Sequence, residues 1–115
     1  MTVFSTILVA NRGEIAIRII RSAQKMGIKC VAVYVDADKN APYLAQADQS
    51  IKLETNYLDA DAILNAAQMT GSEAIHPGYG FLSENAKFAS SVEQSGLVWI
   101  GPSANVISQM GDKLK

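Results

Sequence analysis

The residues whose types and spacing could best bind a ligand lie in residues 74–85. There a short apolar run is followed by a proline, two glycines and two aromatic residues. The proline cannot continue a strand's hydrogen bonding, and Gly78 and Gly80 permit positive φ, so we predict a tight turn after a strand. That turn should hold Tyr79 and Phe81 outward. Bare main chain beside an aromatic ring suits a flat ligand, but glycine turns are also common as plain connectors, and both interpretations remain open here.

Other catalytic groups are few. The chain has one histidine and one cysteine, too few for a zinc site. His76 precedes a proline at a predicted strand end, and we interpret it as a hydrogen-bonded structural residue rather than a base. Cys30 lies in an apolar run and should be a small buried hydrophobe, while Lys113 taken alone is typical of a solvated lysine. These residues predict no metal site and no catalytic centre within the chain.

The common nucleotide-binding loops are not matched. A dinucleotide fingerprint needs three glycines in the turn after the first strand, and residues 11–14 hold one. Asp36 does stand where the acid of that fingerprint is expected, at the end of the second predicted strand. No glycine-rich run leads into Lys-Ser or Lys-Thr, as a phosphate-binding Walker loop requires. The sequence therefore argues against both loops.

Size and charge narrow the class of protein. A chain of 115 residues fits one compact domain, and its net charge of -1 predicts neither nucleic acid nor membrane as a partner. The first ten residues lack the basic start of a secretion signal, and no run approaches the roughly 18 apolar residues that cross a bilayer. We expect a soluble, cytoplasmic protein, and its single cysteine fits a reducing compartment.

The hydrophobic pattern predicts strands alternating with helices. Continuous apolar, β-branched runs are typical of parallel strands buried on both faces, and a 3.6-residue period indicates helices. The predicted strands are residues 6–10, 29–35, 49–53, 74–76 and 97–100, and the predicted helices are residues 14–26, 42–47, 59–70, 85–95 and 103–110. The alternation predicts an α/β fold, an open parallel five-stranded sheet with helices on both faces. Ligands of such sheets bind at the carboxyl ends of the strands.

The helix of residues 14–26 should present two different stripes. Its apolar period predicts a stripe facing the core. The predicted members are Ile15, Ile19, Ala23 and Met26, widened by Ala16 and Ile20. On the other side Arg18, Arg21 and Lys25 form a basic stripe at spacings of three and four. A solvated face and a subunit or domain contact both explain that stripe.

Several segments resemble the amino-terminal domain of biotin carboxylase, the component shared by acetyl-CoA, propionyl-CoA, methylcrotonyl-CoA, pyruvate and urea carboxylases. They read LVANRGEIAIRI from Leu8, AIHPGYGFLSEN from Ala74, IGPS from Ile100 and MGDK from Met110. The resemblance implies a Rossmann-like pre-ATP-grasp domain over residues 1–110, with a linker to an ATP-grasp domain beginning at residues 111–115. It also implies that the complete enzyme uses ATP and Mg²⁺ to activate bicarbonate and then carboxylates biotin on a carrier protein.

The resemblance assigns roles that the bare sequence does not. Tyr79, Gly80 and Phe81 would lie beside the ureido ring of biotin, and Lys113 would contact a phosphate of ATP. The ligands of Mg²⁺ and bicarbonate would lie beyond the last residue, so the chain alone should have no carboxylase activity.

Partners are implied in the same way. Arg18 and Arg21 would lie on the helix that bacterial relatives use to form a homodimer. The other implied partners are the ATP-grasp and carboxyl-terminal domains of the same enzyme, the biotin carboxyl carrier protein and a carboxyltransferase.

The alternative to a carboxylase domain is a free-standing flavodoxin-like module without enzymatic activity, which holds a small molecule or a partner at its strand ends.

Overall fold

The computed structural model describes residues 4–101. In chain order the elements are β1 (Thr6–Val9), α1 (Gly13–Lys25), β2 (Lys29–Tyr34), the 3-10 helix η1 (Asp36–Asp38), α2 (Pro42–Gln46), β3 (Gln49–Lys52), α3 (Ala60–Thr70), β4 (Ala74–His76), α4 (Ala86–Gln94) and β5 (Val98–Trp99). Every strand and helix predicted within this range is present. The predicted helix of residues 103–110 lies outside the described residues.

All five strands are parallel and lie in the order β3-β2-β1-β4-β5, which confirms the predicted fold class. The central strand is β1, where Leu8 lies opposite Val31 on one side and Ile75 on the other. Because parallel strands point the same way, their carboxyl ends meet at one edge of the sheet. The segments that leave this edge are therefore neighbours in space, although they are far apart in the sequence.

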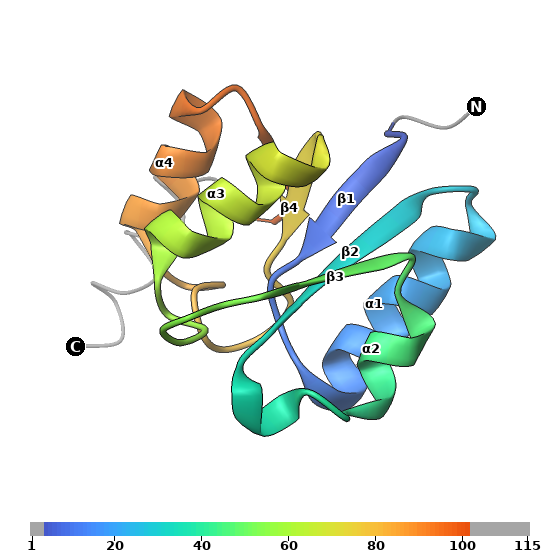
Figure 1. Ribbon diagram of the computed structural model, residues 1–115. Coiled ribbons are helices and arrows are strands. Elements are labelled where there is room, and N and C mark those ends of the chain that lie inside the picture. Colours follow the sequence, from blue (N-terminus) through green and yellow to red (C-terminus); the bar gives the residue numbers. More distant parts are fainter. Residues whose placement is uncertain (1–3, 102–115) are drawn as a thin grey trace.

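Helices cover both sides of the sheet, with α3 and α4 on one and α1 and α2 on the other (Figure 1). We call these the closed face and the open face respectively. Successive strand residues point to opposite faces, so β1 contributes Leu8 to the closed face and Ile7 and Val9 to the open face. This two-sided burial explains why the strands read as continuous apolar runs.

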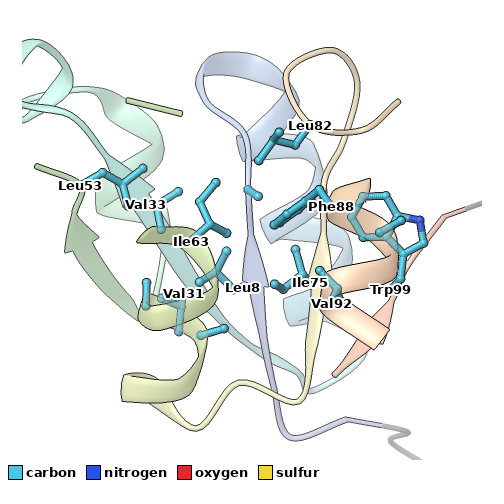
Figure 2. Packing of buried hydrophobic residues seen from close by; sticks show 14 residues of the cluster. Leu8, Val31, Val33, Leu53, Ile63, Ile75, Leu82, Phe88, Val92 and Trp99 are labelled. Atoms are coloured by element: carbon cyan, nitrogen blue, oxygen red, sulfur yellow. The ribbon is translucent and has the colours of Figure 1, made fainter. Parts of the chain in front are cut away.

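The closed face is a continuous apolar core. Figure 2 shows Phe88 and Val92 of α4 and Ile63 of α3 directed at Leu8 and neighbouring strand residues. Phe88 is 1% exposed, and its ring meets the indole of Trp99 nearly edge to face, with centroids 5.6 Å apart. That geometry is one that aromatic pairs prefer.

Local signals start and stop the helices on the closed face. The Asp59 carboxylate accepts a hydrogen bond from the backbone N–H of Ala62, and the Asn85 side chain does the same for Phe88. Each thus satisfies one of the free N–H groups in the first turn of its helix. Gly71 ends α3 in a left-handed conformation, as its place in the sequence predicted.

The predicted buried stripe of α1 was wrong in part. The residues that α1 buries are Ala16, Ile20 and Ala23, whereas Met26 is 64% exposed. Ile15 and Ile19 are only partly buried, and Ile19 packs at the edge of the open-face core, so the centre of the buried stripe lies at Ala16, Ile20 and Ala23. A 3.6-residue period allows either rotation, so the pattern alone did not decide between them. None of the helices between residues 4 and 101 is both long and apolar enough to span a bilayer.

Candidate functional site

The turn predicted from the glycines follows β4 at the carboxyl edge of the sheet, and we call residues 77–82 the glycine turn. Gly78 and Gly80 have φ of +68° and +69°, and Phe81 has φ of +49°. Phe81 is the non-glycine residue with positive φ among residues 4–101. Tyr79 is 77% exposed and Phe81 is 42% exposed, so the outward orientation predicted for both rings is confirmed.

Asn11 holds the glycine turn from beneath. Its side chain is buried, and its Nδ2 donates to the carbonyl oxygens of Pro77 at 2.8 Å and Tyr79 at 2.7 Å. Its Oδ1 accepts from the N–H of Arg12 at 2.8 Å, so both ends of the amide are used. A Cβ added to Gly78 would lie 2.6 Å from this Nδ2. Glycine is therefore required there by space as well as by φ.

His76 also belongs to this support. Its Nδ1 accepts a hydrogen bond from the N–H of Gly78 at 3.1 Å, and burial lowers the pKa of the imidazole. A neutral ring with Nδ1 occupied as an acceptor is a structural group, as the sequence predicted. Cys30 is buried at the open face, and burial raises the pKa of its thiol to about 11, so it remains protonated at neutral pH.

A second polar cluster, the strand-end network, consists of Arg12, Asp38, Tyr43 and Tyr57. Arg12 donates from Nε and Nη2 to the two carboxylate oxygens of Asp38, each at 2.7 Å. The Tyr57 hydroxyl donates to Asp38 Oδ2 at 2.5 Å, and the Tyr43 hydroxyl lies 2.9 Å from both the Tyr57 hydroxyl and the carbonyl oxygen of Val33. The network thus joins segments that follow β1, β2 and β3.

The strand-end network is held together by the opposite charges of Arg12 and Asp38. The hydrogen bonds from Arg12 and then from Tyr57 hold the pKa of the Asp38 carboxyl at about 2, well below its usual 3.8. Burial, followed by the hydrogen bond to Asp38, raises the pKa of the Tyr57 hydroxyl. At neutral pH Asp38 is therefore a carboxylate paired with the guanidinium of Arg12, and the phenol of Tyr57 beside them is protonated.

Sequence reasoning missed this network. It singled out Asp36 at the end of β2, but that carboxylate is exposed and lies 3.6 Å from Lys52 Nζ. Both acids lie in η1, and the turn directs Asp38 rather than Asp36 toward Arg12. The available signal was that Arg12 and Asp38 each follow a buried strand, next to each other in the sheet. Tyr57 gave no signal, because its segment carries no periodic pattern.

An apolar groove of about 880 Å³ runs along α1 on the open face. Its apolar lining comes from Phe4, Ile15, Ile19, Met26, Ile28 and Ile100. Gly78 and Tyr79 of the glycine turn also line it. Ile15 and Ile19, which are only partly buried, thus form a wall of a groove that reaches the candidate site, and Ile19 also packs against the open-face core.

The remaining predicted site residues lie apart from the glycine turn or outside the described range. Arg18 and Arg21 are exposed on α1, and Arg18 also lines the groove. Arg18 Nε lies 3.9 Å from Glu14 Oε1, with both side chains largely in solvent, and such a pair adds little stability. Lys113 lies outside the described residues. Within residues 4–101 no three His, Cys, Asp or Glu side chains form a metal-binding group.

The five-stranded parallel α/β fold agrees with the comparisons to known proteins. Residues 3–107 match the family described as biotin carboxylase, N-terminal domain. The chain belongs to this family.

Two relatives, both biotin-dependent carboxylases or their subunits, match nearly the whole chain. It is 51% identical over 113 residues to the biotin carboxylase of Haemophilus influenzae, covering 94% of this chain and 25% of that protein. It is 47% identical over 116 residues to the propionyl-CoA carboxylase alpha chain of Ruegeria pomeroyi, covering 96% and 17% respectively.

A solved structure agrees as well. The biotin carboxylase domain dimer of the Hydrogenobacter thermophilus 2-oxoglutarate carboxylase, in complex with MgADP, ADP and bicarbonate, superposes with a TM-score of 0.91 at 46% identity. The match covers 94% of this chain and 25% of that one. The chain therefore spans about a quarter or less of the length of these three proteins.

Proposed function

We propose that this chain is the amino-terminal part of a biotin carboxylase that uses ATP to carboxylate biotin with bicarbonate. The observation that carries the proposal is the glycine turn, where the exposed ring of Tyr79 stands beside the main chain of Gly80 at the carboxyl edge of the sheet. A planar ureido ring offers two flat faces and polar edges, and an exposed aromatic ring beside main-chain polar groups can contact both. Family membership supports this ligand over other flat molecules.

The described residues suit biotin better than they suit the metal. Tyr79, Gly80 and Phe81 would contact the ureido ring, while Asn11 keeps the turn in one conformation. Mg²⁺ would come with ATP and supply positive charge at the transferred phosphoryl group. Since residues 4–101 hold no cluster of metal ligands, we assign Mg²⁺ and bicarbonate to other parts of the enzyme. Lys113 is proposed to contact an ATP phosphate.

The proposal includes partners. ATP-grasp and carboxyl-terminal domains would complete the enzyme, a biotin carboxyl carrier protein would deliver biotin, and a carboxyltransferase would use the product. A structural relative is a domain dimer, which supports a homodimer, and we propose that the exposed Arg18 and Arg21 of α1 lie at its subunit contact. We also propose a cytoplasmic location, which the buried, unpaired Cys30 supports.

The experiment measures biotin-dependent ATP cleavage by the complete subunit that contains these residues, together with incorporation of labelled bicarbonate into free biotin. We expect both activities in the wild type. Tyr79→Ala should raise KM for biotin about tenfold with little change in KM for ATP. Met69→Ala removes a similarly exposed apolar side chain from α3 and serves as the matched control.

Absence of biotin-dependent ATP cleavage in the complete subunit would refute the proposal. Tight binding of biotin by the 115-residue chain alone would favour the free-standing module instead. Titration calorimetry of that chain with biotin and with ATP distinguishes the two functions, because a domain completed elsewhere should bind both weakly.

A further inference from the structure

The backbone of Phe81 is held in a conformation that needs support. Its φ of +49° is left-handed, which costs a residue with a Cβ about 1–2 kcal/mol. Such conformations persist where the surroundings stabilise them. Phe81 follows Gly80, which is also left-handed, so this pair sets the direction in which the chain leaves Tyr79. Whatever stabilises Phe81 therefore helps to set the shape of the glycine turn.

The stabilising contact comes from the ring of Tyr57. Its centroid lies 5.5 Å from that of Phe81 with the rings tilted by 53°, a favourable aromatic arrangement. Tyr57 comes from the segment between β3 and α3, far from the glycine turn in the sequence. Phe81 is 42% exposed, and the Tyr57 ring is the aromatic contact on its covered side.

Tyr57 is in turn fixed at its other end. Its hydroxyl donates to Asp38 Oδ2 and accepts from the N–H of Val35 at 3.3 Å. Asp38 is locked by the two hydrogen bonds from Arg12, whose guanidinium carbon lies 5.9 Å from the centre of the Tyr57 ring. A ring held through its hydroxyl and covered by a cation has little freedom to move.

We propose that Tyr57, held by Asp38 and Arg12, is a positioning residue that fixes the glycine turn through Phe81. The assignment of biotin as the ligand of that turn rests on the function proposed above. Tyr57 would act through its ring contact with Phe81 and not on the ligand itself. Arg12 and Asn11 are adjacent in the sequence, so the segment after β1 supports the turn on two sides: Asn11 holds its backbone, and Arg12 acts through Asp38 and Tyr57.

The test combines two measurements. In the complete subunit, Tyr57→Leu removes the ring and the hydroxyl, and we expect KM for biotin to rise about tenfold while KM for ATP changes less than about twofold. Tyr57→Phe keeps the ring and should show a smaller rise. Tyr34→Leu, a half-buried tyrosine at the end of β2, is the matched control and should leave both values unchanged.

A double-mutant cycle separates positioning from general damage. Phe81→Gly accepts the left-handed backbone without strain, so adding Tyr57→Leu to it should change KM for biotin little further. In the 115-residue chain, the NMR amide shifts of Gly78, Tyr79 and Gly80 should move in Tyr57→Leu and stay constant in Tyr34→Leu. This second measurement does not depend on activity.

The outcomes are distinct. A selective rise in KM for biotin that disappears in the Phe81→Gly background supports the positioning role. Equal rises for biotin and ATP, or turn resonances that respond alike in Tyr57→Leu and Tyr34→Leu, would overturn it. If the wild-type subunit lacks biotin-dependent activity, the proposed function fails, and the NMR comparison alone decides whether Tyr57 positions the turn.

Discussion

The two faces of the sheet differ in how completely they are covered and in what covers them. On the closed face, α3 and α4 bury a continuous set of large apolar side chains that includes Phe88. On the open face, α1 and α2 leave an apolar groove beside α1, and the core there includes Tyr43, whose hydroxyl belongs to the strand-end network. The strand-end network spans the carboxyl edge between the two faces, since Tyr43 lies in the open-face core and Tyr57 packs against the closed-face cluster.

Apolar burial and the polar contacts at the carboxyl edge contribute differently to the stability of the fold and to the geometry of the site. Burial of apolar area stabilises the fold but specifies local shape weakly, whereas hydrogen bonds with defined directions fix particular backbone groups. Substitutions on the closed face should therefore change the free energy of unfolding most. Those at the carboxyl edge and on the open face should change the glycine turn or its contacts at a smaller cost in stability.

The largest effect should come from the closed face. Phe88→Ala removes a ring that is 1% exposed and packed on Trp99, and we expect a loss of about 3–5 kcal/mol in the free energy of unfolding. Urea denaturation of the chain measures it. A loss below about 1 kcal/mol would contradict the view that this face carries most of the stability.

The second largest effect should come from adding a side chain to the glycine turn, where Asn11 leaves no room for one at Gly78. Gly78→Ala must accept a left-handed backbone and a Cβ 2.6 Å from Asn11 Nδ2, for a combined cost of about 2–4 kcal/mol. Gly80→Ala is the matched control, because it has almost the same φ with nothing within 4 Å of the added Cβ. It should cost only about 1–2 kcal/mol. Equal losses in denaturation would show that Asn11 does not confine the turn.

A smaller effect should appear in acid. The folded pKa of Asp38 is about 2, so its carboxylate contributes stability that is complete above the usual pKa of 3.8 and is lost as the pH falls toward 2. Allowing for solvent around the half-exposed Arg12, we expect about 1 kcal/mol. Unfolding of the wild type and Asp38→Asn between pH 5 and pH 2 measures it. A constant difference between the two proteins would rule out this titration.

The smallest effect should come from the exposed side of α1. Arg18→Ala breaks an ion pair whose side chains are both largely in solvent, and stability should change by no more than about 0.5 kcal/mol. If α1 forms the proposed subunit contact, Arg18→Ala combined with Arg21→Ala should weaken the dimer of the complete subunit in sedimentation velocity. A dimer unchanged at all concentrations would remove these arginines from the interface.

The sequence predicted the elements well for physical reasons. β-branched runs buried on two faces leave few alternatives to parallel strands, and Gly71 marked a helix end because a left-handed residue was needed there. The glycine turn was predictable because Pro77, Gly78 and Gly80 restrict or free the backbone locally. Local chemistry was sufficient wherever the determining partners lie within a few residues.

What the sequence did not reveal depends on tertiary contacts. The rotation of α1, which buries Ala16, Ile20 and Ala23 fully and leaves Ile15 and Ile19 only partly buried, depends on how the helix packs on the sheet. The choice of Asp38 over Asp36 follows from the direction of a single 3-10 turn. Tyr57 meets Phe81 only because β3 and β4 end at the same edge, which no local pattern records.

Asn11 and Arg12 are adjacent residues that follow the central strand β1. The Asn11 side chain reaches the carbonyl of Tyr79, whereas the Arg12 side chain reaches Asp38. A shift of β1 by one residue against its neighbours would exchange the directions of these two side chains and break both sets of bonds together. A chain with this error could still bury apolar surface on both faces of the sheet, but it would lack the contacts that hold the glycine turn. The dipeptide thus couples the shape of the glycine turn and of the strand-end network to the correct pairing of β1.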